Sequence, residues 1–403
     1  MGDRLLDPRA AADAVLARAP APREEAVPLT EAHGRVLARA VVSADDVPGF
    51  DNSAMDGFAL RSADVAGAGQ GAPVALRLVG ESRAGHPYEE SLEAGEAIGI
   101  STGAMVPAGA DTVLRVEDAA QDGEELRVSS ALPPGKEIRR AGEDIRAGDQ
   151  VLAAGTRLGA AELGVAASTG VAELWCTRPP RLALIVTGDE LVAPPAPLRP
   201  GQIRNTNGYA LAAQAREAGA IVEHVATVGD DYAATVAALE RALEADVAVV
   251  TGGVSVGPHD HVKPALAELG VEQVFWRVAL RPGKPTFFGA RGDTLVFGLP
   301  GNPVSAMVTF HLFARPAIAA MLGTTPRERR AVASFDADYR KQPGRAHVVR
   351  CSLDARADGW HVRPTKDQGS HVLTSMLGAE ALAYLDVERG DVAAGEQVGI
   401  EIL

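Results

Sequence analysis

Cysteine is nearly absent from this sequence, with only Cys176 and Cys351 among 403 residues. Two cysteines cannot form a disulfide framework or a four-cysteine zinc site. The first twenty residues also lack the charged-then-apolar order of a secretory signal. A reducing cytoplasm is therefore the expected location.

Positive charge is also scarce, since 39 Lys and Arg face 53 Asp and Glu, giving a net charge of −14. This balance argues against a general nucleic-acid or membrane-surface binder, because bulk attraction to phosphate needs a basic face. The acidity is uneven: residues 1–180 hold 28 acids and 17 bases, whereas 181–325 hold 13 and 11. An anionic ligand would need a local site.

Residues 294–314 contain no charged side chain, but they do not form a continuous apolar run. Gly298, Pro300, Gly301 and Pro303 interrupt them, whereas a membrane-spanning helix needs about 20 consecutive apolar residues. The pattern predicts a strand, a turn and a buried helix.

The length predicts two to four domains. Leucine and valine residues recur at helical spacing after Asp7-Pro8, which suits a capped helix start and predicts a helix at 7–18. Short runs with a β-strand pattern occupy 74–130. Apolar runs alternate with helical patterns in the next part, which predicts parallel strands with crossover helices. Those strands are predicted at 181–187, 221–228 and 247–251, and the helices at 207–218 and 233–244. Short alternating runs after residue 326 predict a C-terminal β-barrel or sandwich.

A glycine-rich turn follows the strand predicted at 247–251, and its backbone N–H groups favour an anion-binding concavity. It lacks the Gly-Lys-Ser/Thr of a P-loop. Residues 253–257 match the Gly-x-Ser-x-Gly nucleophile elbow, so a hydrolase using Ser255 is an alternative. Its base would come from His311, His347, His361 or His371.

The acids that follow the predicted strands favour a divalent cation. Asp260 is the strongest candidate, and Glu190 and Asp230 also lie just beyond strand ends. Carboxylates are the usual Mg²⁺ ligands beside phosphates. The pair His259 and His261 offers zinc as an alternative, but zinc needs a third ligand from elsewhere.

Two further stretches contain residues that could contribute to a ligand-binding site. Arg277, Arg281 and Lys284 place three positive charges within eight residues. If 277–281 is extended, both arginines project to one face, where two guanidinium groups can hold an oxyanion; a charged strand edge is the alternative. In the turn at 298–306, Asn302 suits a helix cap and Pro303 a first helical turn.

These motifs together resemble the MoeA family of molybdopterin molybdenumtransferases, which includes the E domain of gephyrin. The matching stretches follow the family order and cover most of the chain: 50–59, 101–104, 139–144, 186–191, 251–257, 282–285, 298–305 and 369–370. The resemblance implies insertion of molybdate into adenylylated molybdopterin with release of AMP, dependent on Mg²⁺. A non-catalytic, gephyrin-like scaffold is the remaining alternative.

The resemblance implies a multidomain fold of α+β and α/β type. Residues 1–50 and 140–180 would form a linking domain, 51–139 an inserted β-rich domain, 181–325 an α/β molybdopterin-binding domain with a parallel-type sheet, and 326–403 a C-terminal β-barrel-like domain. It also implies a homodimer, in which the α/β domain of one subunit faces the N-terminal part of the other.

The resemblance assigns the site residues in three groups. The catalytic residues would be Asp56, Thr102, Arg139 and Asp144, and the metal ligands Glu190, Asp230 and Asp260. The substrate would be bound by Gly252, Gly253, Ser255, Arg277, Arg281, Lys284, Pro300, Asn302, Pro303 and Ser370. Family members often carry Lys where Arg277 and Arg281 stand, so the geometry of molybdate binding is expected to differ here, because Arg binds through a planar fork.

Overall fold

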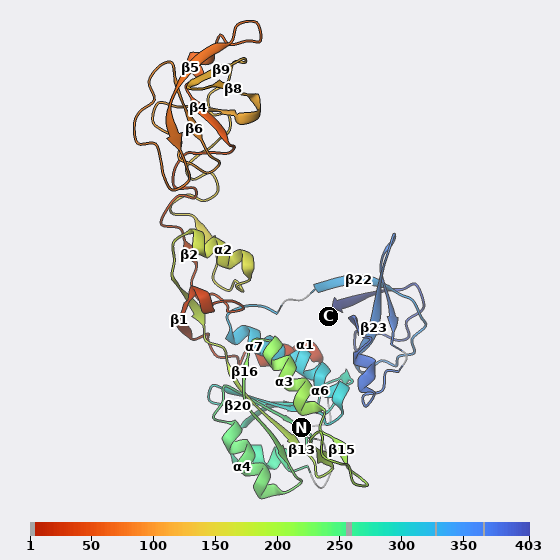
Figure 1. Cartoon of the computed structure of the whole chain (residues 1–403). Helices are drawn as coiled ribbons and strands as arrows, with labels where there is room; N and C mark the ends of the chain where they lie inside the picture. The colour runs from red at the N-terminus through yellow and green to blue at the C-terminus, as the bar shows by residue number, and fades with distance from the viewer. Residues whose placement is uncertain (1–4, 255–259, 327–328, 366) are drawn as a thin grey trace.

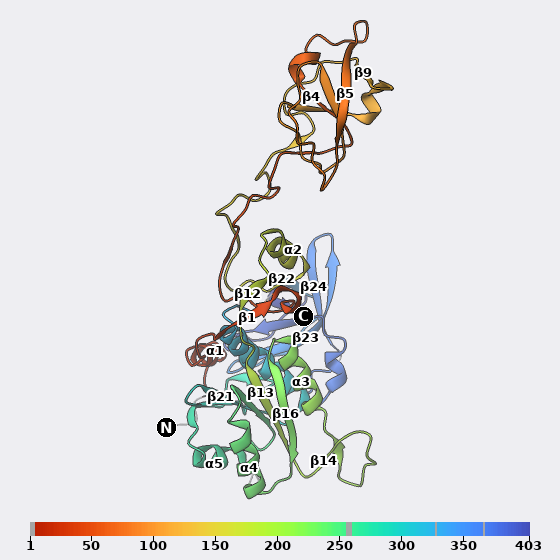
Figure 2. The same ribbon diagram turned by 60° about the vertical axis from the view of Figure 1, so that its left-hand side comes forward.

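The computed structural model describes residues 5–254, 260–326, 329–365 and 367–403. The chain is elongated: a small β domain lies at one end, a narrow arm joins it to an α/β domain, and a second β domain lies beside the α/β domain (Figures 1 and 2). This arrangement confirms the predicted multidomain α+β and α/β architecture.

The α/β domain is built on a six-stranded sheet in the order β16-β13-β17-β21-β20-β18. The first four strands are parallel, whereas β20 and β18 are antiparallel to their neighbours. The strands are β13 (Arg181–Thr187), β16 (Ile221–Val228), β17 (Val247–Thr251), β18 (Glu272–Trp276), β20 (Phe287–Arg291) and β21 (Thr294–Leu299). The predicted parallel-type sheet is therefore confirmed, with two antiparallel strands added at one edge.

Helices cover both faces of this sheet, as strand–helix alternation requires. One apolar cluster joins the sheet to α1, α3, α6 and α7, and a second joins its other face to α4 and α5. These helices are α1 (Pro8–Leu16), α3 (Asn207–Glu217), α4 (Tyr232–Ala242), α5 (Val262–Glu268), α6 (Pro303–Thr309) and α7 (Arg315–Met321). The carboxylate of Asp7 caps α1 as predicted, accepting the N–H of Arg9 at 2.8 Å.

One continuous helical segment, Pro303–Met321, joins α6 and α7 through the π-helical turn η4 (Phe310–Ala314). Within the described residues it is the one helix long and apolar enough to cross a membrane, yet 67% of its most apolar stretch is buried inside the protein. Packing against the sheet explains its composition, as the prediction of a buried helix required.

The C-terminal β domain is a closed barrel. Its strands are β22 (Arg329–Phe335), β23 (Ala346–Arg356), β24 (Gly359–Pro364), β25 (Ala381–Leu385) and β26 (Gln397–Ile402). The sheet closes because β25 pairs with β23 as well as with β26. A short strand of the α/β segment, β19 (Leu280–Arg281), pairs with β23 and brings Arg281 beside His347.

A buried carboxylate ties the barrel to the α/β domain. Glu401 of β26 accepts hydrogen bonds from Arg315 Nη2 at 2.6 Å and Tyr384 Oη at 2.8 Å, and it pairs with His311 Nε2 at 3.0 Å. Burial acts to raise the pKa of Glu401, but the His311 contact and the nearby charges outweigh it and lower the pKa to about 2. The carboxylate therefore stays ionised in the folded protein.

Replacing Glu401 by Gln is expected to lower the free energy of unfolding by about 3 kcal/mol, because Arg315 loses its buried counter-charge. The wild-type contribution is fully present above the unfolded-state pKa of 4.5 and is lost as the pH falls towards about 2. Denaturation curves from pH 3 to 7 measure both effects. Glu272→Gln is the matched control, because Glu272 pairs with Arg18 in solvent; an equally large loss there would contradict this account.

The arm consists of short antiparallel pairs. They are β1 (Glu24–Pro28) with β12 (Glu173–Thr177), β2 (Val41–Val42) with β11 (Gln150–Leu152), and β3 (Asn52–Ser53) with β10 (Ile138–Arg139). Helix α2 (Ala160–Ser168) packs beside them. The chain therefore runs out along the arm and returns along it.

The distal β domain holds a sheet in the order β7-β4-β6-β5-β9-β8. Its strands are β4 (Gly57–Leu60), β5 (Val74–Ser82), β6 (Glu96–Ile100), β7 (Thr112–Arg115), β8 (Ala120–Asp122) and β9 (Glu125–Val128). Two apolar clusters pack against it. The predicted β-rich insertion is confirmed.

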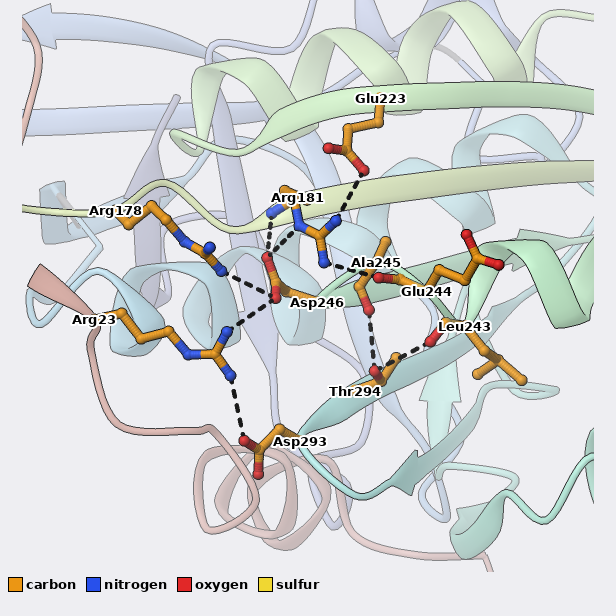
Figure 3. A network of polar contacts seen from close by, with 10 residues as sticks. All are labelled: Arg23, Arg178, Arg181, Glu223, Leu243, Glu244, Ala245, Asp246, Asp293 and Thr294. Atoms are coloured by element: carbon orange, nitrogen blue, oxygen red, sulfur yellow. Dashed lines mark hydrogen bonds and ion pairs between the residues drawn. The ribbon is translucent and has the colours of Figure 1, made fainter. Parts of the chain in front are cut away.

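The root of the arm is clasped by one carboxylate (Figure 3). Asp246, which precedes β17, receives the backbone N–H of Arg181 at 2.8 Å and lies 3.5 Å from Arg178 Nη2 and 3.8 Å from Arg23 Nη1. Arg23 belongs to the outgoing segment, whereas Arg178 belongs to the returning one. Asp246 thus holds both the outgoing and the returning segment of the arm against the α/β domain.

Candidate active site

A glycine turn lies at the carboxyl end of the central strand β17. Gly252 and Gly253 have φ angles of +92° and +62°, in the left-handed region. A Cβ on Gly252 would lie 2.6 Å from Thr187 Oγ1, so a side chain is excluded there. Because β13, β17 and β21 are parallel, the turns after Thr187, Thr251 and Leu299 meet at one edge of the sheet, where such folds bind ligands.

Asn207, at the start of α3, joins two of these turns. Its Nδ2 donates to Thr251 Oγ1 at 3.0 Å and to the carbonyl of Gly301 at 2.8 Å, and Thr251 Oγ1 donates to the carbonyl of Pro300 at 2.8 Å. The side chains of Asn207 and Thr251 are buried, so the network fixes the Pro300 turn against the glycine turn. Sequence reasoning missed this residue, although an asparagine at a helix start beside strand ends was the available signal.

Asn302 does not cap its helix in the predicted way. It occupies the position before α6, but its side chain makes no capping hydrogen bond. Instead Nδ2 donates to Ser370 Oγ at 3.0 Å, and the N–H of Val304 donates to the carbonyl of Ser370. The structure therefore brings Asn302, Pro303 and Ser370 together where the barrel meets the α/β domain.

The premise of an extended segment from 277 to 281 is wrong. Arg277 has a φ of +69°, and only Leu280–Arg281 form a strand. Arg277 stacks on Trp276, with its Cζ 4.1 Å from the ring centroid, whereas Arg281 pairs in register with His347 of the barrel. The two arginines thus do not share one strand face. Lys284 follows them on an exposed turn.

Arg281 lies in a positively charged junction that includes a residue the sequence did not reveal. Burial and the charge of Arg281 lower the pKa of His347 to about 4, so its imidazole is neutral near pH 7. Arg350 is fully buried; its Nε donates to Ser375 Oγ at 2.9 Å, and Nη1 has no hydrogen-bond partner. A buried, unsatisfied guanidinium N–H is suited to an anion.

A cavity of about 470 Å³ adjoins this junction, and Asp367 and Ser375, both bonded to Arg350, line part of it. The carbonyls of Asp367 and Gly369 each accept a hydrogen bond from Arg350 Nη2 at 3.3 Å, and Gly369 directly precedes Ser370. Arg350 therefore supports the loop that carries the predicted site residue. No motif marks it in the sequence.

The three acids predicted to bind metal are not gathered into one cluster. The part of the chain that the structure describes contains no group of three His, Cys, Asp or Glu side chains arranged for a metal ion. Asp189 Oδ1, beside Glu190, accepts the N–H of Asp230 at 2.9 Å, which fixes one acidic corner. These residues fit Mg²⁺ only as one or two carboxylates that add to phosphate oxygens of a substrate, which is the usual protein environment of this ion.

In the distal part of the molecule, Asp56 and Thr102 form a direct pair. Asp56 Oδ1 accepts the N–H of Thr102 at 2.7 Å and its hydroxyl at 2.9 Å. The backbone hydrogen bond, followed by the hydroxyl, lowers the pKa of Asp56. The result is an exposed, ionised carboxylate in a fixed orientation.

The two other residues predicted to be catalytic, Arg139 and Asp144, lie in the adjoining segment. Together with Asp56 and Thr102 they are called the Asp56 wall. Arg139 pairs with Asn52 between β10 and β3, and the N–H of Asp144 donates to the carbonyl of Val47. Both side chains are exposed. Asp51, which the sequence analysis passed over, orders this segment by accepting Arg140 Nη1 at 2.6 Å and the N–H of Ala141 at 2.8 Å.

The two groups of candidate residues lie far apart in one chain. The β4–β6 domain that carries Asp56 is at one end of the molecule, and the carboxyl edge of β13 and β17 is at the other (Figures 1 and 2). A single chain therefore does not bring the two groups of residues together.

The hydrolase and zinc alternatives gain no support from the described residues. Ser255 and His259 lie outside them. Three of the candidate bases are engaged elsewhere: His311 with Glu401, His347 with Tyr339, and His361 with Asp336 and Asp358.

The fold and these two groups of residues define a class: a multidomain protein in which a long arm is joined to an α/β domain with a glycine turn at the carboxyl edge of its sheet. Comparisons with known sequences make the assignment specific. The MoeA N-terminal region (domain I and II) matches residues 6–170, the probable molybdopterin binding domain matches 183–320, and the MoeA C-terminal region (domain IV) matches 332–403. The chain belongs to the MoeA family.

Individual relatives agree over nearly the whole length. The chain is 37% identical to the molybdopterin molybdenumtransferase of Haemophilus influenzae, covering 93% of this chain and 92% of that protein. It is 39% identical to molybdopterin molybdenumtransferase 2 of Mycobacterium tuberculosis, covering 93% and 94%. A crystal structure of the molybdopterin biosynthesis MoeA protein from Pyrococcus horikoshii superposes with a TM-score of 0.86 at 31% identity, covering 99% of both chains.

Proposed function

We propose that this protein is a molybdopterin molybdenumtransferase, which inserts molybdate into adenylylated molybdopterin and releases AMP. The observation that carries the proposal is the match along more than nine-tenths of the chain to relatives of that name. The bond that breaks is the phosphoanhydride between AMP and the phosphate of molybdopterin.

The α/β edge would bind the negative charge of both substrates. The backbone N–H of Gly253 would face the anhydride phosphates, since left-handed turns of this kind form anion nests. The N–H of Gly252 instead donates to the carbonyl of Leu299 at 3.2 Å, so Gly252 would shape the turn rather than contact a phosphate. Arg281, which is exposed where the α/β segment pairs with the barrel, would receive molybdate, and the buried Arg350 would support the loop that carries Ser370. Lys284 and Arg277 would add charge, and Pro300, Asn302, Pro303 and Ser370 would line the site.

The Asp56 wall would complete the site from a second subunit. Support comes from the separation of the two groups of residues in one chain, and from the ionised, oriented state of Asp56. A homodimer with two-fold symmetry would form two such sites. In each, Asp56 would orient the attacking oxygen, with Thr102 holding its carboxylate and Arg139 and Asp144 beside it.

Mg²⁺ is proposed as the resident cation, held between substrate phosphates and one or two of Glu190, Asp230 and Asp260. When bound, it would polarise the phosphoanhydride and offset charge that develops on the leaving phosphate. The protein groups have a separate task, since the nearby N–H donors and guanidinium groups fix the phosphates in place.

The direct test is an assay of AMP release from adenylylated molybdopterin, with and without molybdate and Mg²⁺. We expect release to require both, and a serine-reactive phosphonate to leave the rate unchanged. AMP release independent of molybdate would contradict the transferase proposal. Loss of activity on labelling would instead favour the hydrolase.

A further inference from the structure

Two cations share a single indole ring at the end of β18. Lys263 Nζ lies 3.3 Å from the centroid of the Trp276 ring, and Arg277 Cζ lies 4.1 Å from it. Both cations therefore lie against the same ring. The cation centres are therefore separated by no more than the two distances together, about 7 Å.

This arrangement holds like charges together in a partly buried place. Burial lowers the pKa of Lys263; Asp260 acts to raise it, and Arg277 lowers it further. The faces of an aromatic ring carry negative charge density, so one ring attracts both cations. The ring thus offsets a repulsion that would otherwise separate Lys263 and Arg277.

Trp276 also fixes the pair relative to the glycine turn. Its Nε1–H donates to the carbonyl of Val254 at 3.0 Å, and Val254 follows Gly253 directly and is buried. Arg277 is held by its own backbone, whose N–H donates to the carbonyl of Thr286 at 3.0 Å. The two cations and the turn are therefore parts of one rigid arrangement.

We propose that Trp276 is a positioning residue that presents Lys263 and Arg277 as a spaced pair of cations for a diphosphate group. This inference rests on the proposed function and assigns a task to two residues that the family resemblance did not provide, Trp276 and Lys263. A diphosphate carries charged oxygens on two neighbouring phosphorus atoms, so it can contact both cations.

The test compares Trp276→Leu, which removes the aromatic face, with Trp276→Phe, which keeps a face but lacks the N–H. Binding of inorganic pyrophosphate is measured by calorimetry, and KM and kcat are measured with adenylylated molybdopterin. We expect Leu to weaken pyrophosphate binding and raise KM about tenfold with a much smaller change in kcat, and Phe to stay within about threefold of wild type.

Trp175 provides the matched control, since its ring carries Arg39 at 3.9 Å but lies in the arm. Trp175→Leu should leave both measurements unchanged, and Lys263→Gln should reproduce the Trp276→Leu defect. The inference is overturned if wild type does not bind pyrophosphate, if Trp276→Leu binds normally, or if Phe is as defective as Leu, because the Val254 hydrogen bond would then suffice. Tryptophan-dependent pyrophosphate binding without any AMP release would refute the proposed function while leaving this inference intact.

Discussion

Replacing Asp56 by Asn is expected to lower molybdate-dependent AMP release about 100-fold or more. The change removes one negative charge at a point where the structure keeps the carboxylate ionised and oriented through two hydrogen bonds from Thr102. Losses of this size are typical when a preorganised electrostatic group is removed from a transition state. Single-turnover release of AMP, with substrate binding measured separately, would show the defect in the rate.

Asp64→Asn is the matched control for this experiment. Asp64 lies in the same distal domain and accepts a backbone N–H, that of Gly95 at 2.9 Å, but it is not part of the proposed wall. We expect normal turnover from Asp64→Asn and an unchanged dimer for both variants. Near-normal turnover by Asp56→Asn would remove Asp56 from the catalytic role.

Two inactive variants are expected to restore activity when they share a dimer. Asp56→Asn disables the half-site on the distal domain, and Arg281→Ala disables the half-site on the α/β domain. In a mixed dimer, one of the two sites takes its distal domain from the Arg281→Ala subunit and its α/β domain from the Asp56→Asn subunit, so that site is intact. Random pairing of equal amounts makes half the dimers mixed, and about a quarter of wild-type activity should return.

Co-expression of the two variants with different affinity tags provides the sample, and AMP release provides the measurement. Co-expression of Asp56→Asn with Asp56→Ala is the control, because both defects then lie in the distal domain and no intact site can form. If the Asp56→Asn and Arg281→Ala mixture stays as inactive as that control, the site is not shared between subunits.

The α/β domain was predictable from local patterns because its strands are short buried runs between regular helices. The strands at 181–187, 221–228 and 247–251 have the predicted bounds. The individual barrel strands carry weaker signals: in β22 only Ala333 and Phe335 are buried, and its charged start, Arg329-Arg330, resembles a loop. Its partners are supplied by β24 and β26, far along the chain.

The candidate site likewise contains residues that local sequence patterns predict and residues that depend on distant contacts. Glycine turns are local, so Gly252 and Gly253 were found from sequence, whereas Arg350 and Asn207 act through buried contacts with distant segments. The sequence also misled at Arg277, where alternation suggested a strand but the backbone turns left-handed beside Trp276. The contact of Asn302 with Ser370 was unpredictable because a helix cap explained the same residue equally well.

The clasp on Asp246 makes the arm a lever with a fixed pivot. A small rotation at the pivot becomes a large displacement of the distal domain, which contains β4 (Figure 2) and, directly before it in the chain, Asp56. Accuracy at the tip is therefore set by the stiffness of the root, where three guanidinium groups and one carboxylate hold both segments of the arm. In mechanical terms, this ionic joint is expected to determine how precisely the distal domain is held.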